Sequence, residues 1–235
     1  MTQRVSEQPA WLLHQRPWQE TGALIDFLTP DYGRISLIAR GVRSGRSKRR
    51  GELVPFQALS ISWSGRGDLP TLSSVEAIGD ATFLMGTALS CGFYVNELTL
   101  RLMAQGDVSR GCFAAYSEVI QSLAHDGAPG PALRAFELRL LAEQGYALDL
   151  THAEDGAAVL AERRYVYDPE RGLVETTDAS RTADWRPVVS GDTLLALADK
   201  QLRGGEQARQ ARRLLEAALR PHLGDRPLRS RELLR

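Results

Sequence analysis

The densest group of like side chains in this sequence is basic. Residues 39–51 read ARGVRSGRSKRRG, and their six basic positions are Arg40, Arg43, Arg46, Lys48, Arg49 and Arg50. Together with Arg34 they make an acid-free stretch between Asp31 and Glu52. Guanidinium groups pair with phosphate through parallel hydrogen bonds, so this run could hold a nucleic-acid backbone without reading its sequence. The alternative is a solvated loop, because the run also contains Gly and Ser.

The charge of the chain is divided between its two parts. The whole chain has a formal net charge of zero, but residues 1–79 carry 10 basic and 7 acidic groups, and residues 80–235 carry 19 and 22. The basic run therefore lies in a positively charged part of a neutral chain, and it is the strongest local field in the sequence.

Three aromatic residues stand on expected strands near the basic run: Trp18, Phe56 and Trp63. Flat rings can stack on the bases of a single strand, although an aromatic residue on a strand is more often part of the core. We take Trp63 as the candidate stacking residue beside the cations. The leading hypothesis from these residues is a surface that holds single-stranded nucleic acid.

Motifs of several enzyme classes are absent from the sequence. Neither lysine stands in a P-loop, GRGDL at 65–69 is only a fragment of a dinucleotide glycine pattern, and G-x-S-x-G, H-E-x-x-H and Cys-x-x-Cys do not occur. Glu137 and Glu143 lie among arginines on an expected helix, where solvated ion pairing is commoner than acid–base chemistry. We therefore expect a non-catalytic protein without a cofactor.

The elements that must position the basic run are short strands. Five segments rich in apolar and β-branched residues occur at 10–14, 23–29, 34–40, 53–63 and 69–78, with turn residues between them. Alternation in RISLIAR sends Ile35, Leu37 and Ala39 to one face. Five strands in about eighty residues favour an OB-fold barrel. An SH3-like barrel or a fragment of a sandwich fits nearly as well.

Helical periodicity replaces strand periodicity from Asp80 onward. We expect one helix from an Asp80 cap to about residue 104, a second from a Ser109 cap to Gly127, and a third from about Pro131 to Gly145. Two short strands at 165–174 and helices at about 190–200 and 206–220 follow. The expected fold class is α+β with two domains, an OB-fold barrel over 1–79 and a mainly helical domain over 80–235 with a small β-hairpin near 165–174.

The remaining composition is that of an ordinary globular chain. Hydrophobic residues make up 43% and charged residues 25%, and no segment has the apolar length of a signal peptide or membrane span. Cys91 and Cys112 stand in helical patterns, where free thiols pack as small hydrophobes. We expect a cytoplasmic protein that has no disulfide and does not contact a membrane.

Several stretches resemble the RecO family of bacterial recombination mediators. The run from WLLHQRPWQET through SWSGRGDLPTL is similar in order and spacing, as are GFYVNEL (92–98), PALRAFELRLLAEQGY (131–146) and RPLRSRELLR (226–235). The resemblance covers nearly the whole chain. It implies an N-terminal OB domain and a helical domain in a protein that binds single- and double-stranded DNA and anneals complementary strands.

The resemblance also implies partners and site residues. With RecR, and in some settings RecF, such proteins help to load RecA onto DNA coated by single-strand-binding protein (SSB). The family holds the acidic C-terminal tail of SSB in the helical domain, where Arg134 and Arg209 are the matching cations. The positions matching the family's DNA-contacting strand and loop are Arg34, Arg40, Arg43, Arg46, Lys48, Arg49 and Arg50.

One departure from the family concerns zinc. Many members carry four cysteines in the helical part, and the matching positions here are His152, Asp155, Glu175 and Asp178. One imidazole with three carboxylates is a poor tetrahedral zinc set compared with thiolates. We expect no structural zinc, with the packing of this segment supplied by Tyr165, Val166, Tyr167 and Leu173.

Two other functions compete with DNA annealing. An OB-fold can also be an RNA-binding module without annealing activity, and the relative affinity for DNA and RNA of equal length separates the two. A nuclease would need clustered carboxylates or a metal, and incubation of DNA with divalent cations tests it.

Overall fold

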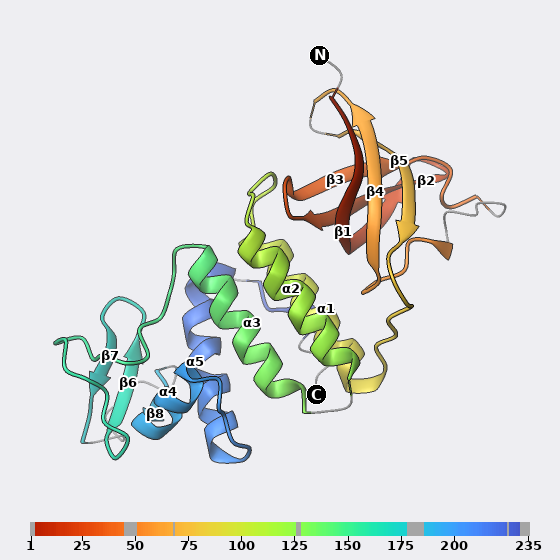
Figure 1. The fold of residues 1–235 in the computed structure, drawn as a ribbon. Coiled ribbons are helices and arrows are strands. Elements are labelled where there is room, and N and C mark those ends of the chain that lie inside the picture. Colours follow the sequence, from red (N-terminus) through yellow and green to blue (C-terminus); the bar gives the residue numbers. More distant parts are fainter. Residues whose placement is uncertain are drawn as a thin grey trace. The chain divides into compact units, whose positions relative to one another are not determined.

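A computed structural model describes residues 3–44, 51–67, 69–125, 128–177, 186–224 and 226–230. The chain forms two compact units, one of Met1–Gly127 with Leu228–Arg235 and the other of Ala128–Pro227. The first unit contains the strands labelled β1 to β5 in Figure 1, together with helices α1 and α2.

Five strands of the first unit close into a barrel in the order β1-β2-β3-β5-β4. They are β1 (Gln3–Trp18), β2 (Gly22–Thr29), β3 (Gly33–Ala39), β4 (Ala58–Gly65) and β5 (Thr71–Ala77). The 16-residue β1 closes the barrel because its first half pairs with β4 and its second half pairs with β2. The sheet is completed by a parallel contact between β3 and β5. The predicted OB-fold is confirmed.

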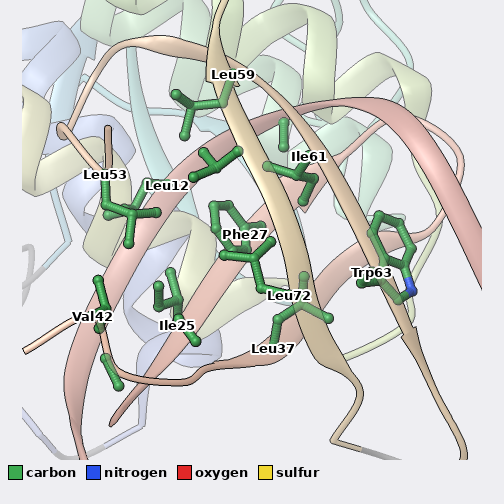
Figure 2. Close-up of a cluster of buried hydrophobic side chains, with 14 of the residues drawn as sticks. Leu12, Ile25, Phe27, Leu37, Val42, Leu53, Leu59, Ile61, Trp63 and Leu72 are labelled. Carbon is green, nitrogen blue, oxygen red and sulfur yellow. The ribbon is translucent and has the colours of Figure 1, made fainter. Parts of the chain in front are cut away.

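The inward residues of these strands form one apolar core. The predicted alternation in β3 is confirmed, since Leu37 and Ala39 are fully buried in this core and Ile35 packs against it. Figure 2 shows side chains from β2, β3 and β4 converging around Phe27. Alternation of period two is what places every second residue inside a barrel.

Two predicted boundaries in the first unit are wrong. The pattern puts residues 53–57 in the fourth strand, whereas β4 begins at Ala58, because Pro55 has no N–H for a ladder and Phe56 adopts a φ of 65°. The pattern also starts a helix at Asp80, whereas α1 spans Gly86–Leu102. The Gln57 side chain holds the intervening connection extended, since it accepts from the Thr82 N–H and donates to the Ile78 carbonyl.

Helices α1 and α2 pack against β1 through polar contacts that are buried or nearly so. The predicted cap of α2 (Arg110–Ala124) is confirmed, because the Ser109 hydroxyl accepts from the Cys112 N–H. Asn96 of α1 donates to the Leu13 carbonyl at 2.9 Å and accepts from the Tyr116 hydroxyl. Trp11 donates its indole N–H to Ser117 and packs on the Tyr116 ring. One asparagine thus connects a strand and two helices.

Residues 228–230, near the C-terminus, belong to the first unit and are bound by Glu97 of α1. The carboxylate of Glu97 accepts from the N–H groups of Arg229 and Ser230 and from the Ser230 hydroxyl, at 2.6–3.0 Å. Burial alone would raise the pKa of Glu97, but these hydrogen bonds lower it below its usual value. Glu97 therefore binds residues 228–230 to α1, although they follow α1 by more than one hundred residues in the sequence.

The second unit combines three helices with a small sheet. Helix α3 (Pro129–Glu143) packs against α5 (Glu206–Leu223). Helix α4 (Gly191–Ala198) precedes α5 in the sequence and packs against it. The predicted hairpin is confirmed as β6 (Arg164–Asp168) and β7 (Gly172–Glu175). A further strand that the sequence did not predict, β8 (Val188–Ser190), makes the sheet order β7-β6-β8. Tyr165, Val166 and Leu173 are buried there, and Tyr167 is half-buried.

Secondary structure changes from strand to helix between Ala77 and Gly86, but the compact units divide after Gly127 because α1 and α2 pack with the barrel. The predicted domain boundary at residue 79 stays a prediction. Within the described ranges, no helix has both the length and the apolar character needed to cross a membrane.

Asn96→Ala should lower the free energy of unfolding by about 3 kcal/mol. The change leaves the Leu13 carbonyl and the Tyr116 hydroxyl buried without this partner, and each unsatisfied group costs about 1–3 kcal/mol. Urea unfolding followed by circular dichroism measures the loss. Tyr116→Phe is the control, because it leaves one buried group, Asn96 Oδ1, without this donor and should cost about half as much. Equal stability of Asn96→Ala and the parent protein would contradict this role.

Candidate nucleic-acid interface

A buried valine fixes the part of the basic run that the structure describes. Val42 is 1% exposed and belongs to the barrel core, while Arg40 and Arg43 on either side of it are exposed. The Arg43 N–H donates to the Thr21 carbonyl at 2.9 Å. The chain therefore folds back from the end of β3 onto the turn between β1 and β2, and it carries the two guanidinium groups there.

Strand register brings two more side chains to this edge of the barrel. Arg16 of β1 is opposite Leu24 of β2, which is opposite Ile38 of β3. Arg16 is exposed, and Trp18, which ends β1, is half-buried opposite Gly22. A Cβ at Gly22 would come within 2.8 Å of the Trp18 carbonyl oxygen, so glycine permits the close approach of β1 and β2 at this turn. We call Arg16, Trp18, Arg40 and Arg43 the basic rim.

The arginines of the basic rim have no acidic neighbour in the part of the chain that the structure describes. No carboxylate there lies within 4.0 Å of Arg16, Arg40 or Arg43. By contrast, Arg110 elsewhere in the first unit pairs with Asp31 at 2.6 Å, and this pairing lowers the pKa of Asp31. Exposed guanidinium groups without acidic partners are suited to phosphate, whereas a paired arginine must first give up its carboxylate.

The spacing of the basic rim suits a nucleic-acid strand that crosses this edge of the barrel. Strands β1 and β3 flank β2, so Arg16 and Arg40 belong to strands about 10 Å apart. Trp18, two residues after Arg16 on β1, offers a half-buried indole at the same edge, and stacking on an aromatic ring contributes about 1–3 kcal/mol per base. The arrangement can hold phosphates and one base without base-edge hydrogen bonds.

Arg34 lies at the opposite end of β3 from Arg40, about 20 Å away along the strand. Its carbonyl accepts from the Gly106 N–H at 2.7 Å, and its Nε is buried without a hydrogen-bond partner among the described residues. A Cβ at Gly33 would come within 1.9 Å of the Asp107 carbonyl oxygen. The loop between α1 and α2 therefore packs on this end of the barrel, and Arg34 is not part of the rim.

Trp63 lies where no base can stack on it. Its side chain is 3% exposed and edge-on to Tyr32, with ring centroids 5.0 Å apart. Figure 2 shows Trp63 among the side chains of the barrel core. Phe56 is equally buried, with its ring against Phe93. The prediction of Trp63 as a stacking residue is corrected, because the register of β4 points it into the core. Trp18 is the aromatic side chain at the basic rim.

Four of the predicted DNA-contacting cations, Arg46, Lys48, Arg49 and Arg50, lie outside the described residues. Sequence reasoning also missed one member of the rim. Arg16 stands alone in HQRPWQET, away from the charge run, so counting cations did not select it. Its position two residues before Trp18, on one face of the same strand, was the available signal.

A Ser–Asp–His row crosses the outer face of the barrel beside the rim. Ser36 donates its hydroxyl to the Asp26 carboxylate at 2.5 Å, and His14 Nδ1 is 3.7 Å from the other oxygen of Asp26. The hydroxyl therefore faces a carboxylate rather than an imidazole. A nucleophilic serine needs a base that accepts its proton and is itself oriented by a third group. This row is a structural contact and not a catalytic triad.

The two predicted SSB-tail cations differ in how accessible they are. Arg134 of α3 is 8% exposed and pairs with the fully buried Glu137 at 2.6 Å. Arg209 of α5 is exposed and pairs with the exposed Glu206 one turn before it. Hydrogen bonds from Arg209 lower the pKa of Glu206, but surface pairs of this kind contribute little to stability. Arg209 is available to an incoming carboxylate, and Arg134 is not.

The residues at the family's zinc positions have other partners. His152 contacts Asp149 at 3.0 Å, Asp155 accepts from the Ala157 N–H, and Glu175 pairs with Arg163. Asp178 lies outside the described residues. Across the ranges that the structure describes, no three His, Cys, Asp or Glu side chains gather as a metal site. Carboxylates with one imidazole remain a poor substitute for thiolates here.

Comparison with known proteins gives matches over both parts of the chain. Residues 1–80 match the family model "Recombination protein O N terminal", and residues 85–232 match "Recombination protein O C terminal". The chain is 45% identical over 231 residues to the "DNA repair protein RecO" of Halorhodospira halophila, covering 97% of this chain and 96% of that protein. The protein of the same name from Paraburkholderia xenovorans is 42% identical, over 98% of this chain and 77% of its own length.

Zinc analysis tests the absence of a structural metal. We expect less than about one zinc atom per ten chains by elemental analysis after purification without chelator, because the donor set lacks thiolates. Treatment with a chelator should leave the unfolding temperature unchanged. One zinc per chain, together with a lower unfolding temperature after chelation, would contradict the expectation.

Proposed function

Because the chain belongs to the RecO family of DNA repair and recombination proteins, we propose that it binds single- and double-stranded DNA at the basic rim and anneals complementary strands. The observation that carries this proposal is the group of three exposed arginines without acidic neighbours among the described residues, beside a half-buried tryptophan. No residue of the rim performs covalent chemistry, so the proposed activity is non-catalytic.

Annealing follows from charge neutralisation. Two DNA strands repel each other through their phosphates, and a protein that pairs several phosphates with arginine lowers this repulsion as the second strand approaches. Trp18 stacks on a base of the first strand and leaves base edges free for pairing. Contacts to phosphate without readout of base edges make the binding independent of sequence.

In the cell, the proposed substrate is DNA coated by SSB. We propose that the second unit binds the acidic C-terminal tail of SSB, and that with RecR, and in some settings RecF, the protein helps to load RecA. With these partners, the protein would act on DNA in the cytoplasm. An acidic tail with an apolar end needs a cation and an apolar slot.

Arg209 is the cation that we propose for the tail. Its guanidinium is exposed, and the pair with Glu206 can be exchanged for a carboxylate of the peptide at little cost. Arg134 contributes only if its buried pair with Glu137 opens. Separation of buried charges is costly, which argues against Arg134 as the first contact.

Charge reversal at the basic rim should abolish annealing. The triple variant Arg16→Glu, Arg40→Glu and Arg43→Glu should bind a single strand at least about 100-fold more weakly, because each charge-assisted contact contributes about 1.5–3 kcal/mol. Fluorescence anisotropy measures binding, and annealing of SSB-coated strands is followed by energy transfer between dyes. Circular dichroism should show an unchanged fold, since all three side chains are exposed.

The matched control carries the same change in net charge on the second unit. Arg139→Glu, Arg203→Glu and Arg212→Glu replace three exposed arginines there and should leave DNA binding within about threefold of the parent protein. Equal losses in both triple variants would contradict a local site. Binding of RNA as tight as that of DNA at equal length and salt would favour an RNA-binding module instead.

The tail site has its own test. Arg209→Glu should weaken binding of an SSB-tail peptide by about tenfold, whereas Arg139→Glu on α3 should not change it. Replacement of the buried pair by Arg134→Met with Glu137→Leu avoids a lone buried charge and should change affinity by less than about twofold. Loss of peptide binding in this double variant alone would identify Arg134 as the contact and overturn the assignment to Arg209.

A further inference from the structure

The second unit contains a cavity that the proposed DNA and tail contacts do not use. It has a volume of about 340 Å³ and is formed by the segment after α3, the turn that follows it, the β6–β7 hairpin and the end of α5. Tyr146 and His222 stack at its wall, with ring centroids 3.7 Å apart and planes inclined by 25°. Tyr146 is half exposed, so its ring is available to a ligand as well as to His222. Neither Arg134 nor Arg209 lines the cavity.

Asp149 supplies a fixed carboxylate in this cavity. Its Oδ1 accepts from the N–H and hydroxyl of Thr151 and from the N–H of His152, at 2.8–3.0 Å. These bonds hold its pKa at about 2, so the group is ionised at neutral pH. The Oδ2 atom contacts His152 Nδ1 at 3.0 Å, and no other described residue donates to it. One oxygen is thus held in place and the other has acceptor capacity left.

The other charged groups of the cavity wall largely cancel. Arg171 donates two hydrogen bonds to Glu154, each of 2.6 Å, and this bidentate pair is neutral overall. Burial lowers the pKa of His222, so its imidazole is neutral and presents a nitrogen acceptor. Asp149, by contrast, has no arginine or lysine partner among the described residues and contacts only the imidazole of His152 through its second oxygen, so the cavity offers a carboxylate, a nitrogen acceptor and an aromatic face.

We propose that this cavity binds a guanidinium group that lies on the Tyr146 ring and pairs with the Asp149 carboxylate. A guanidinium offers five N–H donors and no acceptor, which complements the Asp149 carboxylate and the His222 nitrogen. Its planar cation also stacks on aromatic faces, and it is more weakly hydrated than a compact ammonium group of the same charge. The group can belong to an arginine side chain of a partner protein or to a small guanidine compound.

The negative charge of Asp149 excludes the anionic ligands proposed for the basic rim and for Arg209. A phosphate or the acidic tail of SSB would place a second anion beside Asp149, where like charges repel. The cavity is therefore separate from the basic rim and from the tail contact at Arg209. If annealing and tail binding fail to appear, this inference still stands, because it depends only on residues of the cavity.

Titration of the full-length protein with capped amino acids tests the proposal. Amide NMR spectra are recorded with N-acetyl-arginine methylamide, with the citrulline analogue as a neutral molecule of the same shape, and with the lysine analogue as a point charge. We expect shifts at residues 146–154, 171–173 and 222, and at least about tenfold weaker binding of the citrulline analogue. Agmatine, a free guanidine compound, distinguishes a small-molecule ligand from a peptide side chain.

Two pairs of variants separate binding from folding. Asp149→Asn keeps an oxygen for the Thr151 and His152 donors and should weaken arginine binding by about tenfold, whereas Asp155→Asn makes the same charge change at an exposed turn residue outside the cavity and should not. Tyr146→Ala should weaken binding further than Tyr146→Phe, which keeps the ring. Equal binding of the arginine and citrulline analogues, equal effects of the two Asp variants, or shifts that map elsewhere would each overturn the proposal.

Discussion

Burial of Val42 is the constraint on which the geometry of the DNA surface depends. Val42, with 1% exposure, stands in a segment rich in glycine, serine and arginine, and it reaches the core because the chain turns back at the end of β3. That turn puts Arg40 and Arg43 outside and lets the Arg43 N–H reach the Thr21 carbonyl. The free energy of apolar burial, about 25 cal/mol per Å², thus positions two charges that have no acidic partner among the described residues.

The two ends of β3 have different roles because the helices of the first unit pack at one of them. The turn at Gly33 fits against the Asp107 carbonyl, and Asp31 pairs with Arg110, so this end is occupied by the protein itself. The other end carries the basic rim. Asn96 and Trp11 hold β1 on α1 and α2, and β1 runs from those contacts to Arg16 and Trp18. A rigid strand therefore supports the proposed base-stacking residue, which suits a site that must keep its shape as strands exchange.

Local patterns predicted the elements and much of the core, while residue roles needed tertiary information. Alternation placed Leu37 and Ala39 correctly, and the capping preference of serine placed the start of α2 at Ser109. The pattern could not tell which face of β4 Trp63 takes, because register and bulges decide that and they depend on partner strands. It could not separate buried Arg134 from exposed Arg209, since both stand at helical spacing among arginines. The Asp80 cap failed because Gln57, distant in sequence, holds the connection extended.

If single-stranded DNA crosses the barrel at the turn between β1 and β2, as we propose, photo-crosslinking locates that contact directly. Oligonucleotides with photoactivatable bases are irradiated on the protein, and mass spectrometry identifies the crosslinked residue. We expect crosslinks at Trp18 and neighbouring residues 16–21, with none at the buried Trp63. Crosslinks concentrated at the opposite end of β3, around residues 29–34, or on the second unit would contradict this proposal.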